Sequence, residues 1–207
     1  DGTLLNTIAD LAHSTNYALN KLGYPTHEIE KYNFMVGNGI NKLFERALPE
    51  GEKTEENVLR VRNEFVPYYD IHNADDSRPY PGIPELLSYL QSAGIQIAVA
   101  SNKYQAATEK LVAHYFPGIF EVIRGNLPGT PVKPDPGVAR GILEKLNARP
   151  EETLMVGDSD VDIRTGHNAG LKSCGVTWGF RNRENLVNAG ADFLADTPAE
   201  LEKLLMN

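Results

Sequence analysis

Residues 79–207 alternate short apolar runs with segments of helical periodicity, and this alternation restricts the fold more than any other feature of the sequence. The strand candidates, of which the second and fourth are weaker, are residues 96–100, 120–123, 153–156 and 175–178. The segments with helical spacing of apolar residues are 83–90, 106–115, 138–146 and 161–169. Apolar strands separated by helices predict a parallel, doubly wound (Rossmann-like) sheet with helices covering it.

The region from Ile8 to His72 has a different pattern, because every periodic segment in it reads as helix and none has the period of two of a strand. At its start, Thr7 is placed to cap the first helix, with Asp10 as the acidic residue that completes a capping box. Residues 75–82 are rich in proline, glycine and aspartate, which typically form a linker.

These patterns predict two domains. An α/β core comprises residues 1–6 and 78–207, and an all-helical insertion comprises residues 7–77. Hinges are expected near Leu5–Asn6 and Ser77–Pro79, where the chain passes between the two parts.

Composition excludes some classes of function. A net charge of −8 argues against nucleic-acid binding, which needs a basic face, although it permits one small anion in a local basic pocket. No apolar run has the roughly 18 residues that cross a membrane. Cys174 is the single cysteine, so no intrachain disulfide forms, and we expect a buried structural thiol in a cytoplasmic protein.

Polar residues at the ends of the predicted strands are the candidates for chemistry, because ligands of such sheets bind beyond the carboxyl ends of the strands. Asp1 opens the chain, and Ser101-Asn102 follows the run 96–100. Lys133 precedes a predicted helix, and Gly157–Asp162 follows the run 153–156. Each segment alone is explained by a turn or a helix cap. An acid, a serine, a lysine and paired acids in this order together favour one active site.

These residues resemble the four motifs of the haloacid dehalogenase superfamily, over nearly the whole chain. The corresponding segments are Asp1-Gly2-Thr3-Leu4, Ser101-Asn102, Lys133-Pro134, and Gly157-Asp158 with Asp162. The helical insertion resembles the small helical (C1-type) cap of that family. Within it, Val36-Gly37-Asn38-Gly39, followed by Leu43 and Arg46-Ala47-Leu48, is similar to the phosphoglycolate phosphatase branch.

The resemblance implies a Mg²⁺-dependent phosphatase that acts through an aspartyl-phosphate. It assigns acid/base catalysis to Asp1, whose backbone carbonyl also contacts the metal. Asp158 is the expected side-chain ligand, and Asp162 is either a ligand or a support for the ligands. Phosphate contacts are expected from Gly2, Ser101, Asn102 and Lys133. In the cap, Lys42 and Arg46 are candidates for binding a substrate carboxylate, the alternative being that they are solvated helix charges.

The family's first motif is Asp-x-Asp-Gly-Thr, and this sequence matches it from the second Asp onward. We therefore expect the nucleophilic aspartate two positions before Asp1, and the first core strand mostly before Asp1 as well.

The favoured function is hydrolysis of a small phosphomonoester, with 2-phosphoglycolate as the best guess. A sugar phosphomutase of the same superfamily is the nearest alternative, because it uses the same acid and metal. A 2-haloacid dehalogenase needs neither Asp1 nor the pair Asp158 and Asp162, so these residues count against it. A non-catalytic phosphate-binding protein is a further alternative. The expected partner is a small phosphorylated metabolite, without nucleic acid or membrane, bound by a monomer or homodimer.

Overall fold

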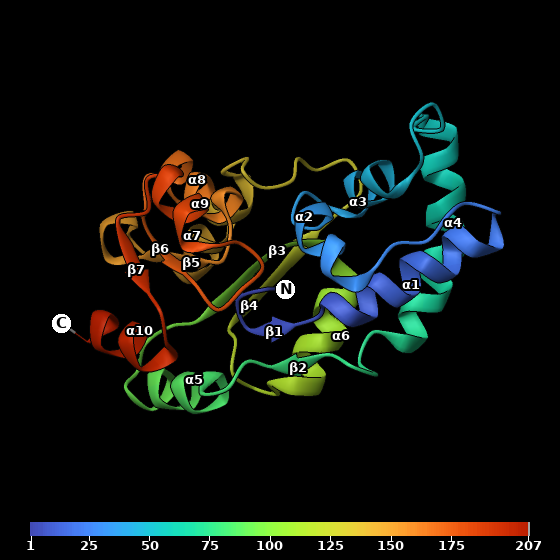
Figure 1. The fold of residues 1–207 in the computed structure, drawn as a ribbon. Helices are drawn as coiled ribbons and strands as arrows, with labels where there is room; N and C mark the ends of the chain where they lie inside the picture. The colour runs from blue at the N-terminus through green and yellow to red at the C-terminus, as the bar shows by residue number, and fades with distance from the viewer. Residues whose placement is uncertain (207) are drawn as a thin grey trace.

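The computed structural model describes residues 1–206. Figure 1 shows two parts side by side, one made of strands and helices and the other of helices. The first part contains β1 (Leu5–Asn6), β2 (Arg78–Pro79), α5 (Ile83–Ser92), β3 (Ala98–Tyr104), α6 (Gln105–Tyr115), β4 (Val122–Asn126), α7 (Gly137–Leu146), β5 (Leu154–Gly157), α8 (Asp160–Ala169), β6 (Lys172–Val176), α9 (Arg183–Asn188), β7 (Phe193–Ala195) and α10 (Pro198–Leu205). The second contains α1 (Ile8–Lys21), α2 (Tyr32–Met35), α3 (Ile40–Ala47) and α4 (Glu55–His72).

The strands β3 to β7 pair in parallel, which confirms the predicted α/β class. β3 pairs with β4, and β5, β6 and β7 form a separate three-stranded sheet in that order. β1 and β2 pair antiparallel, with Leu5 opposite Pro79 and Asn6 opposite Arg78. The two segments at which hinges are predicted therefore lie side by side as a short ribbon.

Several details differ from the sequence-based expectations. β3 continues through Ser101, Asn102 and Lys103 to Tyr104, so these residues belong to the strand rather than follow it. The elements α9 and β7 were not predicted. The capping box at Thr7 was also wrong, because the Thr7 hydroxyl donates to Asp1 Oδ1 at 2.8 Å instead of capping α1.

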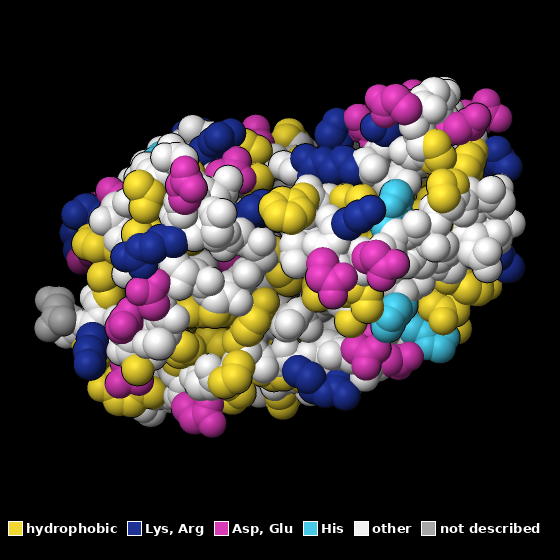
Figure 2. Space-filling model, viewed as in Figure 1, with side chains coloured by type: hydrophobic (Ala, Val, Ile, Leu, Met, Phe, Trp, Pro, Cys, Tyr) yellow, Lys and Arg dark blue, Asp and Glu magenta, His cyan; other side chains and the backbone are white. Residues whose placement is uncertain are grey.

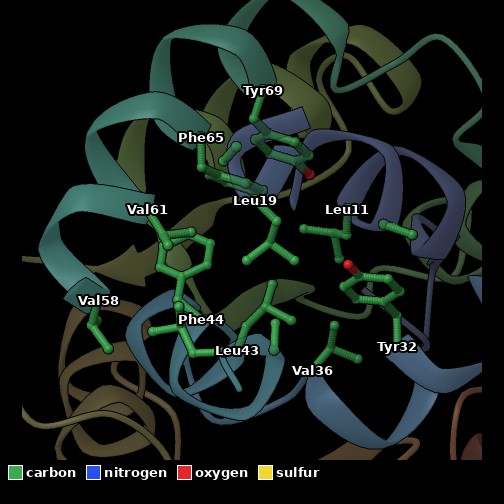
Figure 3. Close-up of a cluster of buried hydrophobic side chains, with 14 of the residues drawn as sticks. Leu11, Leu19, Tyr32, Val36, Leu43, Phe44, Val58, Val61, Phe65 and Tyr69 are labelled. Atoms are coloured by element: carbon green, nitrogen blue, oxygen red, sulfur yellow. The ribbon is translucent and has the colours of Figure 1, made fainter. Parts of the chain in front are cut away.

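The helical part has its own hydrophobic cluster, drawn in Figure 3, in which side chains from α1, α3 and α4 meet. Phe44 and Phe65 contact each other edge to face with ring centroids 4.9 Å apart, and Phe65 stacks on Tyr69 at 5.0 Å. A second cluster joins α5, β6 and α10 in the core. We therefore propose that residues 7–77 form a cap domain, and we call them the cap; residues 1–6 and 78–207 are the core.

The two sheets each have an edge that faces a cavity of about 700 Å³. β6 pairs on both sides, and its residues Ser173 to Val176 are buried. By contrast, the apolar residues of β3 (Ala98–Ala100) and β5 (Leu154–Val156) pair on one side, line the cavity and are half-exposed. Figure 2 shows hydrophobic side chains lining a hollow in this part of the core. We call the space between β3 and β5 the slot.

No helix within residues 1–206 combines the length and the apolar character that a membrane span requires.

Asp10 fastens the first cap helix to the linker that leaves the cap. It is 2% exposed, and its carboxylate accepts hydrogen bonds from the amide of Asp76 (2.9 Å) and from the amide and hydroxyl of Ser77 (2.8 and 2.6 Å). We expect Asp10→Ala to lower the free energy of unfolding by about 3 kcal/mol, because it leaves buried donors unsatisfied. Urea unfolding measures this. Asp75→Ala, an exposed acid of the same linker, is the control and is expected to cost less than about 1 kcal/mol. Equal effects of the two substitutions would contradict the assignment.

Candidate active site

Most of the candidate polar residues from the sequence analysis line one cavity. Its lining includes Asp1, Ser101, Asn102, Lys103, Lys133, Asp158 and Asp162. They come from the start of the chain, the end of β3, the loop before α7, the turn after β5 and the first turn of α8, as the carboxyl ends of parallel strands would place them. Val36, Gly37, Gly39 and Ile40 of the cap line the same cavity. Residues of the core and of the cap therefore line the site together.

Asp158 lies at the centre of the core side of the site and is 4% exposed. Its Oδ1 accepts from the Thr3 hydroxyl at 3.0 Å, and its Oδ2 accepts from the Phe180 amide at 2.9 Å. Burial, together with the nearby charge of Asp162, raises its pKa. Two glycines pack against this carboxylate: a Cβ at Gly2 would lie 2.2 Å from Asp158 Oδ2, and one at Gly179 would lie 2.2 Å from Asp158 Cβ. Only glycine allows the backbone to approach this closely.

Asp162 and Lys133 form a buried ion pair, with 2.6 Å between Asp162 Oδ1 and Lys133 Nζ. Asp162 Oδ2 accepts from the amide and hydroxyl of Ser159, which completes a capping box at the start of α8. Burial acts to raise the pKa of Asp162, but Lys133 and the Ser159 hydroxyl outweigh it and hold that pKa below its usual range. Lys133 Nζ also donates to the Ala100 carbonyl at 2.8 Å, so the ammonium is held against β3.

Asp1 is held at both carboxylate oxygens. Oδ1 accepts from Thr7, as described above, and Oδ2 lies 3.2 Å from Lys103 Nζ. Lys103 is 6% exposed, and burial lowers its pKa to about 7. The backbone carbonyl oxygen of Asp1 receives no hydrogen bond from any residue in the range 1–206.

Ser101 and Asn102 have different surroundings although they are adjacent. The Ser101 hydroxyl accepts from the Lys103 amide at 3.1 Å, which leaves its proton available to an incoming anion. The Asn102 amide group instead links three segments. It donates to the carbonyls of Gly37 (2.9 Å) and Lys133 (3.0 Å), and its oxygen accepts from the Lys133 amide (2.7 Å). Asn102 thus joins the cap, β3 and the Lys133 loop.

Three other candidates are engaged in local contacts. The amide of Gly2 donates to the Leu5 carbonyl at 2.8 Å within the first turn. Lys42 pairs with Glu45 at 2.7 Å and lines a second hollow rather than the main cavity. Arg46 is half-buried and donates to the Met35 carbonyl and to Asn38 Oδ1, both at 2.8 Å, so it shapes the loop above the site.

The donor set around Asp158 suits a hard divalent cation. Asp158 is a buried carboxylate with the carboxylate of Asp162 nearby, and it forms no ion pair within residues 1–206. Oxygen donors of this kind are those that Mg²⁺, Ca²⁺ and Mn²⁺ prefer.

A second group, Asp10, His13 and Asp76, also places three possible ligand atoms within 4.8 Å of one another. It lies at the linker, and both Asp10 oxygens already accept from Asp76 and Ser77. None of these three residues lines the cavity that holds Asp1, Lys133 and Asp158, so they form a separate candidate site for a divalent cation.

The sequence pattern did not identify Thr3, Thr7 or the Phe180 amide as contacts of the acids. Thr3 follows the Asp-Gly pair directly, and its hydroxyl donates to Asp158 Oδ1. Thr7 and Phe180 reach the acids from 6 and 22 residues away, and spacing alone contains no signal for either. The contact between Lys103 and Asp1 joins residues far apart in sequence, and the sequence pattern did not predict it.

Comparison with known proteins agrees with this geometry. Residues 1–176 match the family of haloacid dehalogenase-like hydrolases. A phosphoglycolate phosphatase of Vibrio parahaemolyticus is 34% identical over 97% of this chain and 91% of its own length. One of Aquifex aeolicus is 31% identical over 100% of this chain and 94% of its own length.

Solved structures share the fold. A crystal structure from Lactobacillus delbrueckii subsp. bulgaricus superposes with a TM-score of 0.93 at 31% identity, covering 99% of this chain and 95% of the other. CbbY from Rhodobacter sphaeroides, solved in complex with phosphate, has a TM-score of 0.76 at 26% identity and covers 97% and 92% of the two chains. Since a family match over most of the chain coincides with a cavity that gathers Asp1, Lys133, Asp158 and Asp162, this protein belongs to the haloacid dehalogenase-like hydrolase family.

Proposed function

We propose that this protein is a magnesium-dependent phosphatase that hydrolyses a small phosphomonoester, with 2-phosphoglycolate as the preferred substrate. The observation that carries the proposal is that Asp1, Ser101, Lys133 and Asp158 line one cavity, which residues of the cap line as well. Relatives that align over nearly the whole chain are named phosphoglycolate phosphatase, which supports the choice of substrate.

Asp158 and the carbonyl oxygen of Asp1 are the groups we assign to Mg²⁺. A cation bound there offsets the repulsion between the phosphate and the surrounding carboxylates and orients the phosphoryl group. Unlike Asp158, which forms no ion pair within residues 1–206, Asp162 is paired with Lys133 at 2.6 Å. We therefore propose that it supports the site by holding Lys133 rather than by binding the metal directly.

Lys133 and Ser101 are the groups we assign to the phosphoryl oxygens. Two of the three donors on Lys133 Nζ go to Asp162 and Ala100, which leaves one for the substrate. The Ser101 hydroxyl has a proton to donate, as shown above. Positive charge and donors held in place before the reaction stabilise charge that develops in the transition state.

Asp1 is the residue we assign to proton transfer. A carboxylate held at both oxygens has a fixed direction, which acid/base catalysis requires. In the proposed reaction Asp1 protonates the leaving oxygen and then takes a proton from the water that opens the acyl-phosphate.

For the nucleophile, we propose an aspartate two positions before Asp1, on a strand that occupies the slot. Such a strand would find unpaired backbone edges on β3 and β5 and an apolar lining. Asp1 lines the same cavity, and its backbone nitrogen is the atom to which a preceding residue is joined. A residue joined to this nitrogen would enter the same cavity. Below, "the extended protein" means residues 1–207 preceded by an apolar strand that ends in Asp-X.

A panel of phosphomonoesters tests the substrate class. We expect the extended protein to release inorganic phosphate with Mg²⁺ and to show its highest kcat/KM on 2-phosphoglycolate, compared with glucose 1-phosphate, glucose 6-phosphate and p-nitrophenyl phosphate. Product analysis separates the alternatives. Isomerised sugar phosphate without free phosphate would assign a phosphomutase, and binding of vanadate with no turnover of any ester would assign a phosphate-binding protein.

A further inference from the structure

Lys103 is a buried lysine at the end of β3 that the proposed reaction does not use. Its side chain is 4% exposed and reaches two groups from different parts of the molecule. One is the carboxylate of Asp1, with 3.2 Å between Nζ and Oδ2. The other is Tyr69 of the cap helix α4, whose hydroxyl accepts from Nζ at 2.5 Å and whose ring centroid lies 4.5 Å from Nζ. Lys103 therefore bridges the cap and the acid of the core.

Burying an ammonium group costs several kcal/mol unless nearby groups compensate it. Among residues 1–206, Asp1 provides the one carboxylate within ion-pair distance of Lys103. Tyr69 provides a hydrogen-bond acceptor and an aromatic ring, both of which stabilise a cation. Tyr69 belongs to the cap. It therefore stabilises the Lys103 ammonium group only while the cap is docked on the core.

The two residues that hold the Asp1 carboxylate are both connected to the cap. Thr7, which holds Oδ1, directly precedes the first cap helix, α1. Lys103, which holds Oδ2, rests on Tyr69 in the last cap helix, α4. The two neighbours of Lys103 in β3 also bind the cap, since Asn102 donates to the Gly37 carbonyl and Tyr104 donates to Asp70 at 2.5 Å. The last three residues of β3, Asn102 to Tyr104, thus all contact the cap. Of these three, Lys103 is the one that also contacts Asp1.

We propose that Lys103 is a positioning residue that couples docking of the cap, through Tyr69, to the alignment of the Asp1 carboxylate. This inference rests on the acid/base role proposed for Asp1. With the cap docked, Lys103 is held by Tyr69 and fixes Oδ2 of Asp1. With the cap undocked, Lys103 loses Tyr69 and the direction of Asp1 is no longer fixed on that side. Coupling of this kind is reciprocal, so alignment of Asp1 also favours the docked cap.

Lys103→Met in the extended protein tests the coupling, because methionine has a similar length and fills the space without charge. We expect kcat to fall at least about 10-fold while KM changes less than about threefold, since misalignment of an acid affects the reaction more than binding. Lys110→Met is the matched control. Lys110 is an exposed lysine of α6 that donates to the backbone carbonyl of Asp70 in the cap but does not contact Asp1. Its kcat is expected to stay within about twofold of the parent.

Tyr69→Phe separates coupling from simple packing. It removes the hydroxyl and keeps the ring that stacks on Phe65. We expect it to lower kcat in the parent and to have no further effect in the Lys103→Met background, because residues that act as one unit are not additive. Additive effects of the two substitutions would contradict the coupling, as would a Lys103→Met protein with the kcat of the parent.

A crystal structure of the Lys103→Met protein decides the inference without turnover. We expect the Asp1 carboxylate to leave its present direction in this variant and to keep it in Lys110→Met. An unmoved Asp1 would overturn the positioning role. If the extended parent protein hydrolyses no ester, the proposed phosphatase function fails, and the position of Asp1 in the two structures still decides whether Lys103 aligns it.

Discussion

Asp1→Asn in the extended protein is expected to lower kcat at least about 100-fold, because an amide neither donates an acidic proton nor accepts one from water. The fold is expected to remain, since asparagine keeps the oxygen that accepts from Thr7. Steady-state kinetics on 2-phosphoglycolate and a melting curve measure the two effects.

Asp160→Asn is the matched control for this substitution. Asp160 begins α8, two residues after Asp158, but its carboxylate pairs with Arg164 at 3.3 Å and does not line the cavity. Its turnover is expected to stay within about twofold of the parent. A near-normal kcat for Asp1→Asn, or an equal loss in both variants, would contradict the role of Asp1.

Lys133→Met is expected to affect stability and turnover together. It leaves the buried carboxylate of Asp162 without its cation, and breaking a buried ion pair from one side costs about 3–5 kcal/mol. It also removes the positive charge assigned to the phosphoryl group, for which we expect a loss of about 100-fold or more in kcat. Urea unfolding and steady-state kinetics measure these effects. Lys145→Met, at an exposed lysine of α7, is the control. It is expected to change neither the free energy of unfolding nor kcat by much.

A second variant separates the structural part of this effect from the catalytic part. In Lys133→Met/Asp162→Asn neither buried charge is left unpaired, so we expect a large part of the stability to return. Turnover is expected to stay low, because the charge opposite the phosphate is still missing. Recovery of turnover together with stability would show that Lys133 acts through the fold alone.

The sequence predicted the core fold well where the elements are long and strongly patterned. The helices at 83–92, 105–115 and 160–169 and the strands at 98–104 and 154–157 were anticipated in type and approximate position. The element β7 was missed because Phe193–Ala195 spans three residues, which is too short to show a period. Its strand character depends on pairing with β6, which is a tertiary contact.

The assembly of the site was predictable because strand order and direction place the ends of parallel strands together. The pairing of individual polar groups was less predictable. Thr7 was expected to cap α1, but a hydrogen bond to a charged carboxylate is stronger than one to a neutral group, and the structure brings Asp1 within reach. The Asn102 amide joins Gly37 and Lys133, which lie 65 and 31 residues away in sequence. Such contacts depend on how cap and core meet, which local spacing does not encode.

Release of inorganic phosphate from 2-phosphoglycolate by the extended protein tests the central claim most directly, measured with Mg²⁺ and with EDTA. The same measurement on a protein with alanine in place of the aspartate two positions before Asp1 completes it. We predict phosphate release that requires Mg²⁺ and is abolished by this alanine. No release with Mg²⁺ present, or release that persists both in EDTA and in the alanine variant, would contradict the account.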